Sequence, residues 1–279
     1  MINFFKYHFR PFIKVTLLLV FIPSAFSQKK IPKQKKVIIN SIEEKREKLI
    51  EISDNIWEAA ELSLREFKSS KYLSDYAEEN GFTVKKGVAG ISTAFTATYG
   101  SGRPIIGIMG EFDANAGISQ KKQPTKEPLI KGAAGHGCGH NLFGTASLAA
   151  AIAIKEQIES GEISGTVIFY GTPAEETIFA KVWMVREGLF DKLDLCMDWH
   201  PGSEIAAATQ SSKALVDFRL KFFGNAAHAS GDPWNGNSAV DALELYTTGL
   251  NYYREHIKPT ARIHYDIEKA GDVVNVVPE

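Results

Sequence analysis

Apolar side chains recur along this chain with two periods, one helical and one extended. After Ser41, which opens a sequence typical of a capping box, apolar residues recur at helical spacing as far as Leu64, so we expect a helix that begins at Ser41. The same period predicts further helices, and short apolar or alternating runs predict strands. The other expected helices end at Asn80 or cover Asn141–Ile158 and Ile178–Glu187, and the expected strands are Thr93–Tyr99, Pro104–Met109, Thr166–Tyr170 and Leu193–Trp199.

Strands that alternate with helices are typical of an α/β domain. We therefore expect a mostly parallel sheet that helices cover on both faces, and we assign it to residues 41–210. In such sheets, binding sites form just beyond the carboxyl ends of the strands.

The pattern changes after about Ser211. A long alternating strand is expected over Ala214–Phe222, a helix over Asn237–Glu255 and a strand over Arg262–Ile267, which together predict a separate α+β domain over residues 211–279. A strand–helix–strand unit of about 70 residues is small for a domain. Because it reaches Glu279 without a closing element, we expect the chain to be the N-terminal fragment of a longer protein.

The N-terminus has the order of a secretory signal peptide. Basic residues precede the apolar run Val15–Ile22, and Ser24-Ala25-Phe26-Ser27 supplies small residues before a cut near Ser27–Gln28. The run is shorter than the roughly 20 apolar residues of a spanning helix, although an uncleaved anchor is the alternative. We expect residues 1–27 to be a signal peptide and residues 28–40 a polar leader. The mature chain would be secreted or periplasmic, with no further contact with a membrane.

Charge and composition narrow the classes of function. The chain has 32 Lys and Arg against 33 Asp and Glu, so it lacks the basic excess of a nucleic-acid-binding protein. Its 17 Phe, 9 Tyr and 4 Trp exclude a disordered chain, and 2 Cys exclude a disulfide scaffold.

The densest group of reactive side chains is His136-Gly137-Cys138-Gly139-His140. A thiolate and an imidazole two residues apart can reach one metal ion, and both suit zinc. A glycine-rich turn with incidental Cys and His is the alternative. A disulfide between Cys138 and Cys196 is conceivable as well, but two flanking histidines favour a ligand role for Cys138.

Three further polar clusters each follow an expected strand: Glu175 and Glu176, His200, and Asp113. Taken singly, each has a plain alternative, namely a helix N-terminus, a core or surface histidine, and a turn aspartate. Taken with Cys138, they place ligand-type side chains at one edge of the sheet. The four clusters together predict two metal ions that share and activate a water molecule.

The motifs HGCGHN, PAEE, WHP, GNAAHA and NVVP occur in this order, and with them the chain resembles the dinuclear-metal aminoacylase/carboxypeptidase family of amidohydrolases. Within the family it is most similar to the branch of p-aminobenzoyl-glutamate hydrolases, from about Ile42 to Glu279. The resemblance implies a zinc-peptidase-like catalytic domain with an inserted lid and dimerisation domain. It also implies two divalent ions, zinc or manganese, and a homodimer.

The resemblance implies roles for single residues. The implied metal ligands are Cys138, His140, Glu176 and His200. Glu175 would be the general base, and Asp113 would support the ligands from behind. Glu111 stands where relatives often have His or Asp, and it receives no ligand role.

Other implied features lie near the end of the chain or outside it. His228 would bind the developing oxyanion, often in the site of the partner subunit, and Asn275 would contact the substrate. Asn115-Ala116 stands where close relatives commonly have Leu-Pro, which would alter the loop beside the metals. A further metal-ligand histidine is expected beyond Glu279.

The implied activity is metal-dependent hydrolysis of the amide bond in N-acyl or N-aroyl amino acids such as p-aminobenzoyl-glutamate. Glu175 would take a proton from the attacking water and return it to the leaving nitrogen. A dipeptidase or an aminoacylase of the same family is one alternative. A truncated, inactive fragment that only binds or acts as a scaffold is another, and we expect the fragment by itself to be inactive or weakly active.

Overall fold

The computed structural model describes residues 31–207 and 211–279, so the signal peptide expected at residues 1–27 lies outside the described residues. The described residues form two compact units, and the chain passes from the first to the second between Ser203 and Glu204. Among the helices of these ranges, none combines the length and the apolar character that a membrane crossing requires.

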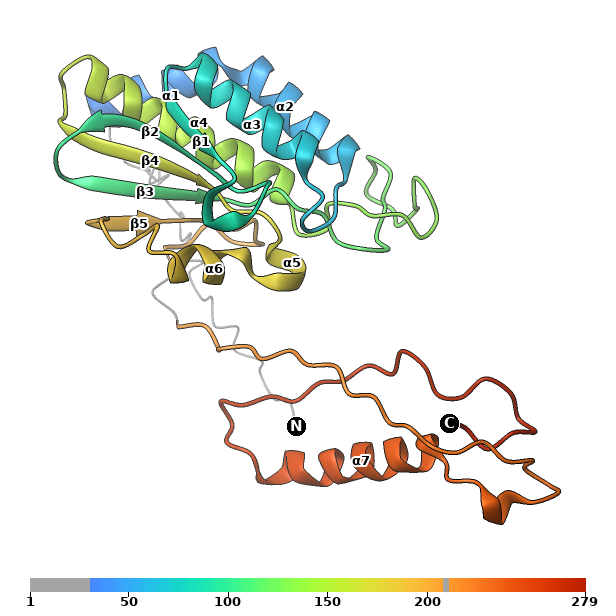
Figure 1. Ribbon diagram of the computed structural model, residues 1–279. Coiled ribbons are helices and arrows are strands. Elements are labelled where there is room, and N and C mark those ends of the chain that lie inside the picture. Colours follow the sequence, from blue (N-terminus) through green and yellow to red (C-terminus); the bar gives the residue numbers. More distant parts are fainter. Residues whose placement is uncertain (1–30, 208–210) are drawn as a thin grey trace, which may run out of the picture. The chain divides into compact units, whose positions relative to one another are not determined.

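The first unit is built on a five-stranded sheet (Figure 1). The strands lie in the order β1 (Thr83–Lys86), β2 (Phe95–Ser101), β4 (Gly165–Gly171), β3 (Ile105–Gly110) and β5 (Leu195–Met197). β3 runs parallel to β4 and β5, whereas β1 pairs with β2, and β2 with β4, in the antiparallel sense. The α/β class is confirmed, but the sheet is mixed. Only residues 87–94 join β1 to β2, which is too short for the crossover that a parallel pair needs.

Helices cover both faces of the sheet (Figure 1). One face carries α1 (Lys33–Glu44), α2 (Arg46–Ala59), α3 (Phe67–Glu79) and α4 (His140–Glu159), and the other carries α5 (Glu175–Ile178) and α6 (Ala180–Arg186). Short 3-10 turns occupy Val88–Gly90, Pro233–Asn235 and Arg254–His256.

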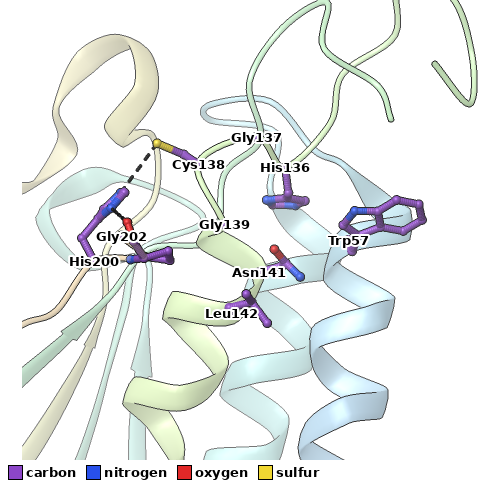
Figure 2. Close-up of a pocket in the computed structure, with 10 residues that line it drawn as sticks. Trp57, His136, Gly137, Cys138, Gly139, Asn141, Leu142, His200 and Gly202 are labelled. Atoms are coloured by element: carbon purple, nitrogen blue, oxygen red, sulfur yellow. Dashed lines mark hydrogen bonds between the residues drawn. The ribbon is translucent and has the colours of Figure 1, made fainter. Parts of the chain in front are cut away.

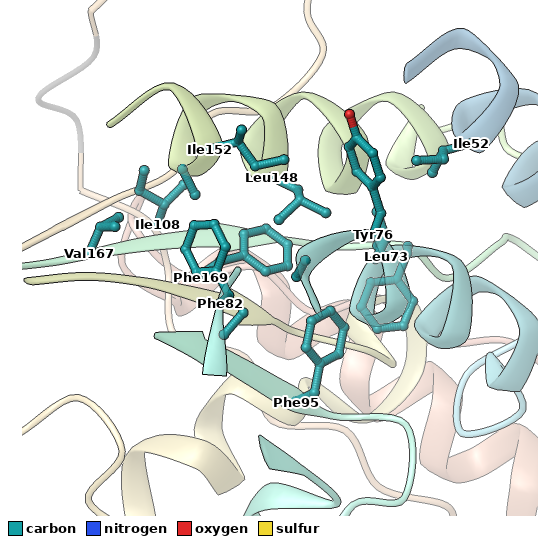
Figure 3. Packing of buried hydrophobic residues seen from close by; sticks show 14 of the residues in the cluster. Ile52, Leu73, Tyr76, Phe82, Phe95, Ile108, Leu148, Ile152, Val167 and Phe169 are labelled. Atoms are coloured by element: carbon teal, nitrogen blue, oxygen red, sulfur yellow. The ribbon is translucent and has the colours of Figure 1, made fainter. Parts of the chain in front are cut away.

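The larger core lies between the sheet and α2, α3 and α4. Leu148 and Ile152 of α4 and Val167 and Phe169 of β4 belong to this cluster and have no exposed surface (Figure 3). Burial of four such side chains is worth about 1.5–3 kcal/mol each before the entropic cost of ordering them. This packing fixes α4, and with it the His140 end of the helix, against the sheet.

The helix expected to begin at Ser41 begins at Lys33 instead, within the segment expected to be a polar leader. Ser41 lies inside α1, where its buried hydroxyl donates a hydrogen bond to Glu156 of α4. Lys45 Nζ adds an ion pair at 2.6 Å from the same carboxylate. The capping-box prediction was wrong because a serine hydroxyl can bond a neighbouring helix as well as its own backbone.

The second unit contains α7 (Ala239–Tyr253), which agrees with the helix expected there. The Ser238 side chain caps it by accepting a hydrogen bond from the Asp241 amide at 3.1 Å. In residues 211–279 the structure has no strand at Ala214–Phe222 or Arg262–Ile267, so these two predictions were wrong. Alternating apolar and polar side chains give a segment one apolar face, but a strand also needs backbone hydrogen bonds to a neighbouring strand. Residues 211–279 contain only isolated bridges.

Candidate metal centre

The parallel strands bring the predicted ligands to one edge of the sheet. Glu111 and Asp113 follow β3 directly, and His200 follows β5. Glu175 and Glu176 form the first turn of α5 after β4. Because β3, β4 and β5 run in the same direction, their carboxyl ends lie together, as the sequence pattern predicts.

Two sets of candidate ligands share His140. One set is Cys138, His140 and His200, and the other is Glu111, His140 and Glu175. In each set, one ligand atom from each residue lies within 4.8 Å of the others. Thiolate, imidazole and carboxylate donors at this spacing suit zinc and related divalent ions.

Hydrogen bonds fix the direction of both imidazole rings. His140 Nδ1 lies 3.0 Å from Asp113 Oδ1, and His200 Nδ1 lies 2.9 Å from the Pro201 carbonyl oxygen. A neutral ring that donates from Nδ1 carries its lone pair on Nε2. Both Nε2 atoms are therefore available as ligands, and that of His200 lies 3.6 Å from Cys138 Sγ (Figure 2).

Buried atoms without partners provide the test of whether a cation fits. Within the described residues four buried side-chain atoms find no hydrogen-bond partner, and three of them are Glu111 Oε2, His140 Nε2 and Glu176 Oε1. His140 Nε2 lies 2.8 Å from Glu111 Oε2 and 3.8 Å from Glu176 Oε1. Buried acceptors that face one another without a donor lower the stability of the fold, and a cation bound between them removes this penalty. The residues present therefore fit a divalent metal ion.

Asp113 links two of the segments that form the site. Its Oδ2 accepts hydrogen bonds from the Glu176 amide at 2.9 Å and from the Ser63 hydroxyl at 3.0 Å. Burial alone would raise the pKa of Asp113, but hydrogen bonds from His140 and from the Glu176 amide outweigh it and keep that pKa below its usual range. Asp113 is thus a charged group that orients His140, the position that a supporting role requires.

The acidic surroundings act on the thiol and on the predicted general base. Burial, followed by the charge of Glu176, raises the pKa of Cys138 to about 11, so the thiol keeps its proton until a cation binds. Burial and the neighbouring Glu176 also raise the pKa of Glu175. A carboxylate with a raised pKa is a better proton acceptor at neutral pH.

A pocket of about 540 Å³ opens beside Cys138 and His200 (Figure 2). Gly139 is one of the lining residues and has φ +80°, and a Cβ there would lie 2.9 Å from Pro201 Cγ. Glycine therefore allows the loop after β5 to approach the start of α4. Trp57 and Leu142 add an aromatic and an aliphatic side chain to the lining.

Two supporting residues have no role assigned from the sequence. Glu66 is fully buried and accepts hydrogen bonds from the Ala174 amide at 2.9 Å and from the Thr93 hydroxyl at 3.0 Å. It thereby holds Ala174, whose φ is +55°, directly before Glu175. Asn115 Oδ1 accepts a hydrogen bond from the Cys138 amide at 3.2 Å. No motif marks Glu66, whereas Asn115 stands out in the sequence only as a departure from close relatives.

The remaining predicted site residues, His228 and Asn275, belong to the second unit. The structure brings them together, since the Ala229 amide donates to the Asn275 carbonyl at 3.1 Å. His228 Nδ1 accepts from the Gly231 amide at 3.0 Å, so a neutral ring carries its proton on Nε2 and presents it as a donor. Their contacts with oxyanion and substrate stay predictions.

No protein-family model matches the chain, but its relatives among known proteins are enzymes named for hydrolysis. The chain is 44% identical over 239 residues to one of the subunits of p-aminobenzoyl-glutamate hydrolase from Escherichia coli (strain K12), which is 85% of this chain and 49% of the relative. It is also 31% identical to Xaa-Arg dipeptidase of Mus musculus, over 92% of this chain and 58% of the relative. The chain belongs to the aminoacylase/carboxypeptidase family of amidohydrolases.

A solved structure supports the fold of this family member. An aminobenzoyl-glutamate utilization protein from Klebsiella pneumoniae matches with a TM-score of 0.58 and 17% identity, over 86% of this chain and 66% of that one. The chain spans about half the length of the curated relatives it matches.

Proposed function

We propose that this chain provides the metal centre of an amidohydrolase that cleaves N-acyl or N-aroyl amino acids of the p-aminobenzoyl-glutamate type. The observation that carries the proposal is the set of unpartnered buried atoms of Glu111, His140 and Glu176 beside the carboxylate of Glu175. The similarity to a relative named for this substrate supports the choice of substrate.

Cys138, His140, Glu176 and His200 would hold two divalent ions, zinc or manganese. When bound, such ions polarise the scissile carbonyl and acidify a water molecule. Glu175 accepts the proton of the attacking water at its carboxylate and returns it to the leaving nitrogen. The raised pKa of Glu175 suits both transfers, since the group must first take up and then release a proton.

Residues of the second unit complete the proposed mechanism. His228 donates a hydrogen bond from Nε2 to the oxyanion that develops on the carbonyl, a type of contact worth about 10²–10³ in kcat. Asn275 contacts the substrate. The hydrogen bonds of the Ser230 and Gly231 amides to His228 Nδ1 hold the imidazole in the donor form that this role needs.

The experiment compares wild-type protein with Glu175→Gln after loading with zinc or manganese. Hydrolysis of p-aminobenzoyl-glutamate is followed by chromatography of released p-aminobenzoate, and metal content by elemental analysis. We expect Glu175→Gln to keep its metal and to lose about 10²–10⁴ in rate. Glu162→Gln, at an exposed carboxylate, is the matched control and should behave as wild type. Equal, measurable turnover by Glu175→Gln and by wild type would refute the proposed role of Glu175.

The similarity to Xaa-Arg dipeptidase supports one second candidate, a dipeptidase. Parallel assays with an alanyl-arginine dipeptide separate the two, because each predicts a higher kcat/KM for its own substrate. A scaffold without activity is the remaining candidate, and it predicts that purified protein binds neither zinc nor manganese.

Export and self-association are part of the same proposal. Removal of residues 1–27 would deliver the enzyme to the periplasm or the medium, and N-terminal sequencing should then find Gln28 as the first residue. A homodimer would allow His228 to act in the partner's site. Light scattering should give twice the mass of the mature chain, and the mass of a single chain would contradict the dimer.

A further inference from the structure

We propose that Glu111 is an additional protein ligand of the metal centre and that Lys181 is the residue that positions it. This inference rests on the proposed function only in that a divalent ion binds. It extends the ligand set beyond Cys138, His140, Glu176 and His200 to a second carboxylate, directly after β3.

Glu111 is buried in a way that calls for two cationic partners. It is 3% exposed, and its Oε1 forms an ion pair with the Lys181 ammonium. The second oxygen, Oε2, has no hydrogen-bond partner although it is buried as well. A buried carboxylate is stable when both oxygens are paired, so Oε2 still lacks a positive partner.

The contact between Glu111 Oε2 and His140 Nε2 has the geometry of two neighbouring ligands. The atoms are 2.8 Å apart, a distance that would allow a hydrogen bond, yet neither atom makes one. The oxygen therefore lies off the direction in which a ring N–H would point. Two ligand atoms, each about 2.0–2.2 Å from one ion, lie about 3.4 Å apart in a tetrahedral site and about 3.0 Å apart when they subtend a right angle at the ion. The separation of 2.8 Å is close to the right-angle value, and the off-line direction leaves room for an ion between the two atoms.

The hydrogen bond at Nδ1, on the other side of the His140 ring, also favours a cation between His140 Nε2 and Glu111. When the ring is neutral and Nδ1 donates to Asp113, Nε2 carries a lone pair. That lone pair and the oxygen of Glu111 would repel each other at 2.8 Å. A shared cation turns this repulsive contact into two favourable ones.

Lys181 comes from an element that the core holds in place. It lies in the first turn of α6, next to Ala180, and Ala180 and Met184 have no exposed surface and belong to the smaller core cluster. The ammonium is thus presented from a fixed backbone rather than from a loop. By holding Oε1, it leaves Oε2 of Glu111 turned toward His140.

Metal affinity and ligand-field spectra test the proposal without any assay of activity. Zinc affinity is measured by competition with a chromophoric chelator in wild type, Glu111→Gln, Glu111→Asp, Lys181→Met and Lys181→Arg, and Co(II) absorption is recorded for each. Glu162→Gln is the control at an exposed carboxylate. Circular dichroism in EDTA reports the fold of each variant.

We expect Glu111→Gln to weaken zinc binding by at least about 100-fold and to shift the Co(II) bands. Lys181→Met should weaken it by about 10–100-fold, the range for residues that orient a ligand, with partial recovery in Lys181→Arg. If Glu111→Gln fails to fold, the zinc affinity of Glu111→Asp tests the proposal instead. Aspartate keeps the negative charge, but its shorter side chain moves the carboxylate oxygen away from the metal.

Unchanged affinity and unchanged Co(II) bands in a folded Glu111 variant would overturn the inference. The contact at 2.8 Å would then be a pair between the Glu111 carboxylate and a protonated His140. If wild-type protein itself bound no zinc, manganese or cobalt, the proposed function would fail first, so the two failures are distinguishable.

Discussion

The protonation of His136 couples the stability of the first unit to pH. His136 Nε2 lies 3.1 Å from the Ile56 carbonyl oxygen of α2, and burial lowers the pKa of the ring from 6.5 to about 4. The unfolded chain binds a proton below pH 6.5, whereas the folded chain does so only near pH 4. The free energy of unfolding should therefore be at its full value above pH 6.5 and fall as the pH is lowered toward 4.

The size of this pH dependence follows from the difference between the His136 pKa in the unfolded and folded chains. A single proton contributes about 1.4 kcal/mol per pH unit within this window, so acidification from about pH 7.5 to about pH 5 should remove about 2 kcal/mol. For a domain that is marginally stable this is a large share of the total, since small domains have only about 5–15 kcal/mol.

His136→Gln isolates this contribution. Glutamine keeps an N–H donor for the Ile56 carbonyl but does not titrate. Urea unfolding of both proteins in EDTA, at about pH 7.5 and about pH 5, gives the difference between the variant and the wild type at each pH. That difference should change by about 2 kcal/mol in favour of the variant at the lower pH. His264→Gln, at an exposed histidine, controls for the change in composition. Parallel pH dependence in wild type and His136→Gln would refute the reasoning.

The remaining predictions concern packing, backbone and metal linkage. Leu148→Ala should lower the free energy of unfolding by about 2–5 kcal/mol in urea, because Leu148 has no exposed surface. Glu66→Ala should cost about 1–3 kcal/mol by thermal unfolding and reduce kcat, since the Ala174 amide loses its acceptor, whereas Glu66→Gln should retain most of both. Ala60→Gly should raise the melting temperature, because Ala60 ends α2 with φ +41°. Zinc at about 100 times its Kd should stabilise the protein by about 2.7 kcal/mol, and EDTA should reverse this.

The convergence of the candidate metal ligands could be predicted in large part from local sequence. Cys138 and His140 are two residues apart, and Glu175, Glu176 and His200 each follow a short apolar run. Such runs indicate buried strands, and parallel strands bring their carboxyl ends to one edge. Neither step requires knowledge of long-range contacts. The α/β class and α7 could be predicted for the same reason, since they depend on the period of apolar residues.

Only the tertiary structure decided which side chains form contacts between segments that are far apart in the sequence. Ser41 could cap its own helix or bond Glu156, and only the packing of α1 on α4 selects the second. The direction of β1 and β2 depends on strand pairing, which apolar periodicity does not specify. Glu66 carries no motif, and Glu111 receives no ligand role from the sequence; burial beside Ala174 and His140 is what draws attention to them. A sequence records local propensity and the order of residues, whereas burial and unpaired charge arise only when distant segments meet.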